Sequence, residues 1–206
     1  MKNYYAEYKV TVPEGKSGIW SVEKFTVSQR DAKFFNLRQA INSHRGYRPI
    51  SHGKYTRLAR EGAWDAIMTD TPAEIRDHLD PIYEAKGYIL INGLGLGVVL
   101  NACLKKKEVE HCTVVEKSED VIKLVAPHYY KKFGHKRLTI VQDDAFTFNQ
   151  PKLIKPPSGK FDMVWHDLWD NICVDNLPEY TKLKRRYAKR TRWQGCWAES
   201  FVKMNR

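Results

Sequence analysis

The chain has 206 residues, of which 42% are hydrophobic and 29% are charged, and its formal net charge is +11. This length and composition predict a globular protein with one main domain and exclude a disordered or low-complexity chain. The sequence has no run of about 18 apolar residues and no apolar segment of the signal-peptide type, so we expect a cytoplasmic protein that makes no membrane contact.

Two hairpins are predicted in the first 70 residues. Residues 4–12 alternate between apolar and polar side chains, which is typical of a half-buried strand. After a loop at residues 13–18, the β-branched and aromatic run 19–27 predicts the second strand of that hairpin. Short apolar runs without helical spacing predict another hairpin over residues 54–69.

Two helices are predicted in the same region. Ser28, with Asp31 three residues later, is an N-cap signal for the first helix. The apolar stripe of that helix consists of Phe34, Leu37 and Ile41. The second helix has the stronger start signal, because Thr71 fits the N-cap, Pro72 the first helical position and Glu74 the closing residue of a capping box.

From residue 88 onward, short apolar runs alternate with helical stretches. The apolar runs lie at residues 88–91, 112–115, 138–141 and 163–165, and the helical stretches at 98–106, 119–130 and 177–189. Continuous apolar strands separated by helices predict an α/β domain whose parallel sheet is covered on both faces. A fifth strand is expected over residues 196–202. We therefore divide the chain into an N-terminal β-hairpin and helical region, residues 1–86, and a main domain, residues 87–206.

Three glycines, Gly93, Gly95 and Gly97, separate the first strand of the main domain from the helix that follows. Such a turn directs backbone N–H groups and a helix N-terminus towards a ligand above the end of the strand. The dinucleotide fingerprint requires a small residue where this chain has Val98, and the phosphate-binding loop G-x-x-x-x-G-K-[ST] is absent. The turn therefore favours a nucleotide-like cofactor other than NAD, FAD or ATP.

Acidic residues follow the next strands. Glu116 ends the second strand, about 20 residues beyond the glycines, where a carboxylate can accept hydrogen bonds from both hydroxyls of a ribose. The stretch "VQDDAF" places Asp143 and Asp144 after the third strand. Each acid alone is typical of a surface or capping carboxylate. Their order behind a glycine turn is what favours a cofactor site.

The G-x-G-x-G turn resembles the glycine motif of the class I S-adenosylmethionine-dependent methyltransferases. That resemblance implies a Rossmann-like fold with strand order 3-2-1-4-5 and S-adenosylmethionine as the cofactor. It also implies that Asp144, or Asp143 in its place, binds the adenine amino group.

Asp167 and Asp170 follow the fourth strand in "FDMVWHDLWDN". Two carboxylates beside a cationic sulfonium could orient and deprotonate an amine nucleophile. Two other interpretations remain open: Asp170 caps the next helix while Asp167 only ends its strand, or the neighbouring His166 takes part as a titrating group.

Residues 88–171 resemble, more narrowly, the spermidine synthase branch of the same fold. That resemblance implies a catalytic base at Asp167, a polyamine-binding acid at Asp170 and decarboxylated S-adenosylmethionine as the cofactor. The family carries an aspartate inside the glycine motif, where this chain has Leu96. We therefore expect an S-adenosylmethionine-dependent methyltransferase with an unidentified acceptor. Aminopropyl transfer and a non-catalytic binding role on the same fold are the alternatives.

The segment 182–206 contains nine basic residues and a single acid, Glu199. It predicts either a site for nucleic acid or another polyanion, or a solvated basic face. Assembly into a homo-oligomer is open. The cysteines and histidines have no metal-ligand spacing, so we expect no metal site and no disulfide.

Overall fold

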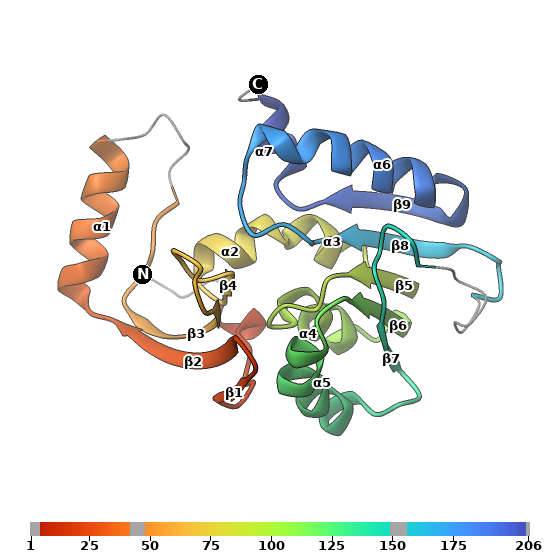
Figure 1. The fold of residues 1–206 in the computed structure, drawn as a ribbon, viewed down its shortest axis with the longest axis horizontal. Helices are drawn as coiled ribbons and strands as arrows, with labels where there is room; N and C mark the ends of the chain where they lie inside the picture. The colour runs from red at the N-terminus through yellow and green to blue at the C-terminus, as the bar shows by residue number, and fades with distance from the viewer. Residues whose placement is uncertain (1–4, 42–47, 149–155, 205–206) are drawn as a thin grey trace.

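The computed structural model describes residues 5–41, 48–148 and 156–204. It contains two sheets, shown in Figure 1: a four-stranded antiparallel sheet of order β1-β2-β3-β4 and a five-stranded parallel sheet of order β7-β6-β5-β8-β9. The antiparallel sheet belongs to the N-terminal part of the chain, and the parallel sheet begins at Gly87.

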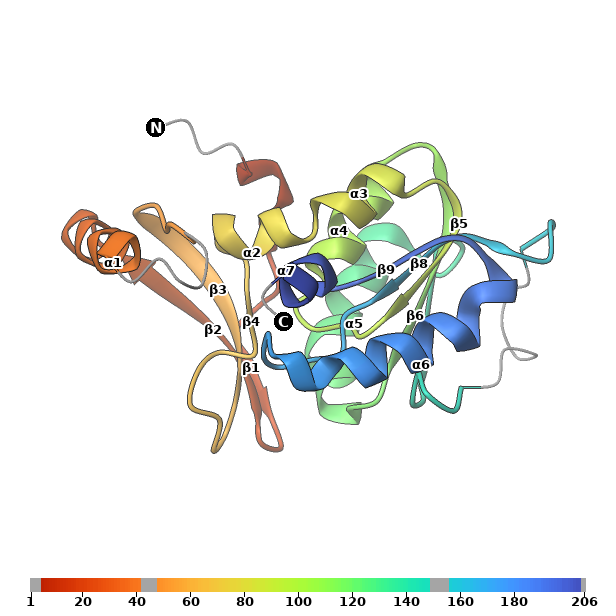
Figure 2. The ribbon, with the colours of Figure 1, turned by 90° about the horizontal axis from the view of Figure 1, so that it is seen from above.

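The N-terminal part carries η1, four strands and three helices. Their bounds are η1 Ala6–Tyr8, β1 Gly15–Ser17, β2 Trp20–Val27, α1 Gln29–Ile41, β3 Gly53–Arg60, β4 Met68–Thr69, α2 Pro72–Asp77 and α3 Leu79–Glu84. Seen from above in Figure 2, β2, β3 and α1 form one end of the molecule, and α2 and α3 lead from them to the parallel sheet. The predicted hairpin over residues 54–69 is confirmed by the pairing of β3 with β4.

The strand predicted over residues 4–12 is wrong in its described part. Residues 6–8 form the 3-10 helix η1, and residues 9–14 have no regular structure. The apolar alternation comes instead from Val10 and Val12, which are buried in the core, and the Val10 N–H donates to the Asp70 carboxylate at 3.2 Å. The first hairpin is therefore formed by β1 and β2, and β1 lies within the segment predicted to be a loop.

Helix α1 begins as predicted, but its apolar stripe faces solvent. The Ser28 hydroxyl accepts the Asp31 N–H at 3.1 Å and donates to the Asp31 carboxylate at 2.7 Å, which is an N-cap contact. The exposed fractions of the stripe are 72% for Phe34, 61% for Leu37 and 73% for Ile41. The opposite face is held by the Asn36 amide, which bonds both the N–H and the carbonyl of Ile50.

Helix α2 starts at Pro72 with Thr71 as its N-cap, but the predicted capping box is wrong. The Thr71 side chain makes no capping hydrogen bond and instead pairs with the Thr69 hydroxyl at 2.9 Å. The Glu74 carboxylate turns away from the N-cap and lies 3.8 Å from the Arg48 guanidinium. A tertiary contact has replaced the local one.

The parallel sheet confirms the predicted Rossmann-like fold. Its strands are β5 Gly87–Asn92, β6 Val109–Glu116, β7 Leu138–Gln142, β8 Phe161–His166 and β9 Thr191–Cys196. The helices that follow them are α4 Val98–Lys105, α5 Glu119–Phe133, α6 Leu177–Tyr187 and α7 Glu199–Met204. Since β5 is the first strand of this sheet, the order β7-β6-β5-β8-β9 is the expected 3-2-1-4-5.

The fifth strand is displaced from its predicted position. Residues 191–196 form β9, whereas most of the predicted strand, residues 199–204, is helix α7. The predicted helix ends at residue 189, and residues 190–195 contain no continuous apolar run that would indicate a strand. In the structure, Arg192 points outward from the edge strand and pairs with Asp162 at 3.1 Å.

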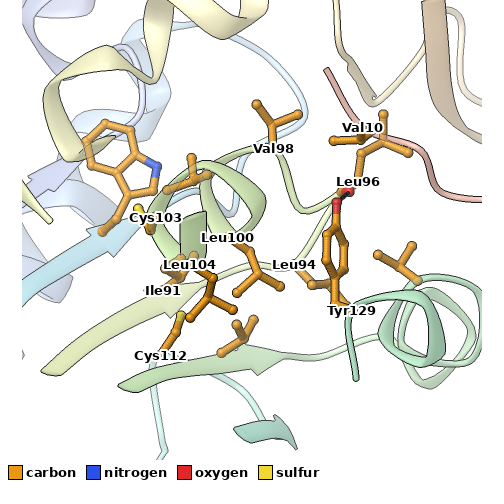
Figure 3. Close-up of a cluster of buried hydrophobic side chains, with 14 of the residues drawn as sticks. Val10, Ile91, Leu94, Leu96, Val98, Leu100, Cys103, Leu104, Cys112 and Tyr129 are labelled. Carbon is orange, nitrogen blue, oxygen red and sulfur yellow. Dashed lines mark hydrogen bonds between the residues drawn. The ribbon is translucent and has the colours of Figure 1, made fainter. Parts of the chain in front are cut away.

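The core is layered on both faces of the parallel sheet. One cluster joins Ile89 and Ile91 of β5 to α4 and α5, and a second joins Leu90 of the same strand to Leu183 and Tyr187 of α6. The first cluster also takes in buried side chains of the N-terminal part, and Figure 3 shows Val10 beside Leu96 and Tyr129. The antiparallel sheet is therefore packed into the same core as the main domain. No helix in the described segments has the length and apolarity needed to cross a bilayer.

We expect Gly97→Ala to be far more destabilising than Gly159→Ala. Both glycines have φ of 72°, so each substitution costs about 1 to 2 kcal/mol from the left-handed backbone alone. A β-carbon at Gly97 would lie 2.3 Å from the ring of the fully buried Tyr129, whereas Gly159 has open space around it. Overpacking should add about 1 to 3 kcal/mol at Gly97. Urea denaturation of both variants measures the difference, and equal losses would contradict this packing.

Candidate functional site

A cavity of about 400 Å³ lies at the carboxyl edge of the parallel sheet, between that sheet and the N-terminal part. This volume is within the range of small-molecule sites. The cavity is lined by every predicted site residue except Gly97: Gly93, Gly95, Glu116, Asp143, Asp144, Asp167 and Asp170. The ends of β5, β6, β7 and β8 thus bring together residues that are far apart in the sequence.

The glycine turn packs tightly on neighbouring protein atoms. Gly93 and Gly95 have φ of 97° and 50°, and β-carbons there would lie 1.9 Å from the Asp167 carbonyl oxygen and 2.6 Å from the Met68 sulfur. Gly97 faces the Tyr129 ring rather than the cavity. The glycines are therefore needed for packing, and this packing places the turn directly beside the end of β8.

Glu116 connects β6 to the glycine turn. One of its carboxylate oxygens accepts the Leu94 N–H at 2.8 Å and the other accepts the Ser118 N–H at 2.8 Å. A carboxylate oxygen can accept two hydrogen bonds, so each oxygen keeps one acceptor position beyond these contacts. Glu116 is thereby held rigidly at the cavity wall with capacity left for a ligand.

Asp143 and Asp144 lie on the turn after β7. The Asp144 carboxylate accepts the Phe146 N–H at 2.9 Å and the Lys117 ammonium at 3.0 Å. Partial burial favours the neutral form of Asp144, but these two contacts outweigh it, and the net shift lowers the pKa of its carboxyl. The Asp143 carboxylate accepts the Asp144 N–H at 2.7 Å. Either acid could meet an adenine amino group, so the choice between them stays a prediction.

Asp167 lies at the back of the cavity among buried titratable groups. Its carboxylate is 3.7 Å from Nε2 of His78, which is itself 3.9 Å from the Glu74 carboxylate. Burial, followed by the charges of Asp77 and Glu116, raises the pKa of Asp167 to about 7. Burial, followed by Asp167 and Asp77, raises the pKa of Glu74 to about 8 against the opposing Arg48 charge.

His78 is the uncharged member of this group. Its side chain is completely buried, and neither ring nitrogen has a hydrogen-bond partner among the described residues. Burial and the Arg48 charge lower the pKa of His78 to about 3, so the ring is neutral near pH 7. Because the neutral imidazole brings no positive charge, it does not offset the burial that raises the pKa of Asp167 and Glu74.

His166 lies outside the cavity. Its Nδ1 is 2.8 Å from the Asn92 amide nitrogen, so Nδ1 accepts and Nε2 carries the hydrogen, 3.4 Å from the Gln194 side-chain oxygen. Burial lowers the pKa of His166 to about 4. The side chain therefore faces the interior on the other side of its strand, which does not suit the titrating role left open above.

Asp170 is engaged by a residue of the N-terminal sheet. Its carboxylate accepts a hydrogen bond of 2.6 Å from Arg60 of β3, which is 110 positions earlier in the chain. The Arg60 guanidinium also lies 5.3 Å from the centre of the Trp20 ring. Asp170 is thus a partner of Arg60 rather than a helix cap, since the next helical turn starts only at Val174.

The cavity lining is acidic and aromatic. Besides the predicted acids it includes Glu74 and Glu179, and its aromatic residues are Trp20, Phe146, Trp169 and Trp197. Arg60 and Lys117 are the only basic residues among the described residues of the lining. Carboxylates and aromatic faces both stabilise cations, so this site suits a positively charged ligand in a protein that is basic as a whole.

Sequence patterns missed the contribution of the N-terminal part. Arg60, Met68 and Glu74 line the cavity, yet their local patterns predict only hairpin and helix positions. The sequence predicts Glu74 as the closing residue of a capping box and not as a residue of the cavity. Within the described ranges, no group of three or more His, Cys, Asp or Glu side chains is arranged so that it could hold a metal ion.

The basic segment is part of the fold rather than a free tail. Within its described residues, Lys184 and Lys203 both pair with Glu199, and Arg192 pairs with Asp162. The buried side chains of α6 are Tyr180, Leu183 and Tyr187. Polyanion binding by this segment stays a prediction.

Comparisons with known proteins give partial structural likenesses. No protein-family model matches the chain, and no curated protein matches it. The CcbJ methyltransferase of Streptomyces caelestis is 13% identical over 58% of this chain and 45% of its own, with a TM-score of 0.44. A dimethyladenosine transferase of Plasmodium falciparum is 17% identical over 48% and 32%, with a TM-score of 0.35. Coclaurine N-methyltransferase, solved with N-methylheliamine and SAH, is 14% identical over 48% and 28%, with a TM-score of 0.37. The chain thus covers less than half the length of each of these three structures.

We expect Asp167→Asn to stabilise the protein at alkaline pH. The pKa of Asp167 is raised from 3.8 to about 7, so between these values the native state holds a proton that the unfolded state has lost, and stability falls as pH rises. The amide has no charge to bury. The variant should match the parent near pH 4 and exceed its stability at pH 8, as measured by urea denaturation. Asp170→Asn, which removes an ion-paired carboxylate, should give no such gain. An Asp167→Asn effect independent of pH would contradict this explanation.

Proposed function

We propose that this protein binds S-adenosylmethionine and catalyses methyl transfer from it to an amine. The observation that carries the proposal is one cavity in which the glycine turn, Glu116, the Asp143–Asp144 pair and Asp167 meet. The Rossmann-like sheet places all of them at its carboxyl edge, where ligands bind in such folds.

The lining offers residues that would suit each part of this cofactor. Glu116 has acceptor capacity for the ribose hydroxyls, and Asp143 or Asp144 can accept from the adenine amino group. The remaining carboxylates and indole rings suit a sulfonium cation. When bound, S-adenosylmethionine supplies an electrophilic methyl group. The residues described below act on the nucleophile.

Asp167 is the proposed general base. With a pKa of about 7 its carboxylate is available near neutral pH and still has a useful affinity for a proton, the balance that favours acid–base catalysis. The amine nitrogen would lose its proton to Asp167 as it forms its new bond. Glu74, on the neighbouring α2, has a pKa raised to about 8, so near pH 7 its carboxyl keeps its proton and would offer the amine a hydrogen-bond partner rather than a negative charge.

Aminopropyl transfer from decarboxylated S-adenosylmethionine is a second candidate, and the acidity of the cavity favours it. Seven carboxylate residues line the cavity against two basic ones, which suits a polycationic acceptor. Leu96 is completely buried in the core, so the position at which the spermidine synthases carry an aspartate faces away from the cavity here. The two candidate reactions use different cofactors: S-adenosylmethionine carries an α-carboxylate, and decarboxylated S-adenosylmethionine does not.

A ligand panel tests the cofactor. Calorimetry with S-adenosylmethionine, S-adenosylhomocysteine, methylthioadenosine and NAD should show binding of the first three and none of NAD. Glu116→Gln, which keeps one acceptor oxygen, should weaken all adenosine ligands by about tenfold or more, as expected for a lost charged hydrogen bond. Glu119→Gln on the exposed surface of α5 is the matched control. Tight NAD binding, or no binding by any ligand, would remove the proposal.

Asp167→Asn tests catalysis. We expect the variant to bind S-adenosylhomocysteine within about threefold of the parent and to lose about 10²- to 10⁴-fold in turnover, the usual contribution of a general base. Turnover is measured as S-adenosylhomocysteine formed with a panel of mono- and diamines. Asp175→Asn, an exposed carboxylate outside the cavity, is the control. A binding-only protein on this fold would show no turnover in the parent, and unchanged turnover in the variant would exclude Asp167 as the base.

A further inference from the structure

Among the described residues of the cavity lining, Arg60 is the basic residue that contacts Asp170. Of the two basic residues in the described lining, Lys117 pairs with Asp144 at the end of the cavity assigned to adenine. The Arg60 guanidinium contacts Asp170 and the Trp20 ring, and Asp170 follows β8, which lies on the opposite side of β5 from β6 and β7. The end of the cavity beside Arg60 must hold the part of the cofactor that extends beyond the ribose.

A carboxylate entering this cavity needs a cation to receive it. Apart from Arg60 and the paired Lys117, the charged residues of the described lining are acids, and a like charge without compensation is costly in a partly desolvated site. Arginine matches a carboxylate better than lysine does, because its planar fork donates two parallel hydrogen bonds. The contact to Asp170 uses one of the five N–H donors of Arg60.

The pairing of Arg60 with Asp170 is suited to exchange. Both side chains are about one-third exposed, at 34% and 35%, so their attraction is screened by solvent and modest in strength. A ligand carboxylate can therefore compete with Asp170 for the guanidinium without leaving a buried charge unpaired.

We infer that Arg60 recognises the α-carboxylate of the cofactor and so selects S-adenosylmethionine over its decarboxylated form. The inference rests on the proposed function and deepens it, because the carboxylate is what separates a methyl donor from an aminopropyl donor in this pocket. It also assigns a role to the N-terminal sheet: β3 supplies the group that reads the amino-acid end of the cofactor.

Binding of matched ligands tests the inference. S-Adenosylmethionine and S-adenosylhomocysteine carry the carboxylate, whereas decarboxylated S-adenosylmethionine and methylthioadenosine lack it. Arg60→Gln should weaken the first two by about 10- to 100-fold, the range for a lost charge-assisted hydrogen bond. The last two should change by less than about threefold. Arg57→Gln on the same strand, which breaks the pair with Glu23 outside the cavity, is the matched control and should change none of them.

Asp170→Asn should change the affinity for the carboxylate-bearing ligands in the opposite direction. Removing the competing carboxylate should tighten S-adenosylhomocysteine binding severalfold and leave methylthioadenosine unchanged. Equal weakening of all four ligands by Arg60→Gln, or unchanged S-adenosylhomocysteine binding in Asp170→Asn, would overturn the inference. A parent protein that binds none of the four would instead remove the proposed function, so the two failures are distinguishable. A folded state for each variant is verified by its thermal transition.

Discussion

The close contact between Gly93 and the Asp167 carbonyl is the constraint on which the site depends. A β-carbon at Gly93 would lie 1.9 Å from that oxygen, so only glycine allows the turn after β5 to pack on the end of β8. The Asp167 N–H donates to the Asn92 carbonyl at 2.8 Å, which extends the pairing of the two strands to this point. The contact fixes the glycine turn and Asp167 as one unit, against which Glu116 is then held.

Burial disfavours the charged forms of the titratable groups that surround this unit. The charged forms of Asp167, Glu74 and His78 would each be better solvated in water. Burying these groups together raises the pKa of both acids and keeps the imidazole neutral. Such an arrangement costs folding free energy at neutral pH. It also produces a carboxylate that is able to accept a proton near pH 7, a property that an exposed aspartate lacks. Reactivity and instability therefore have the same physical source.

The sequence predicted the first four strands of the parallel sheet because their signals are local, whereas β9 lies before most of the strand predicted over residues 196–202. Continuous apolar runs and the helices between them are consequences of burial on both faces, and they gave the strands and, through the resemblance, their order. The Ser28 cap was equally local. The strand over residues 4–12 and the capping box at Glu74 failed because both patterns serve tertiary contacts: Val10 and Val12 enter a distant core, and Glu74 faces the cavity. Arg60 could not be placed for the same reason, since its partner is 110 positions away.

The charge distribution explains why the N-terminal sheet matters to the site. A chain with net charge +11 presents at this edge a cavity whose charged residues, among those described, are seven acids and two bases. Under the proposed function, these acids would attract a sulfonium and an amine and would repel the carboxylate of S-adenosylmethionine. The strands of the main domain end mostly in acids at this edge, and the cation that this domain does supply, Lys117, is paired with Asp144. A cation for the end of β8 therefore comes from the N-terminal part. β3 brings Arg60 across the cavity to Asp170, and the pairing keeps both charges satisfied when no carboxylate is bound. An acidic pocket with one exchangeable arginine can thus hold a zwitterionic amino-acid group beside a cationic acceptor, which neither the acids nor the arginine could do alone.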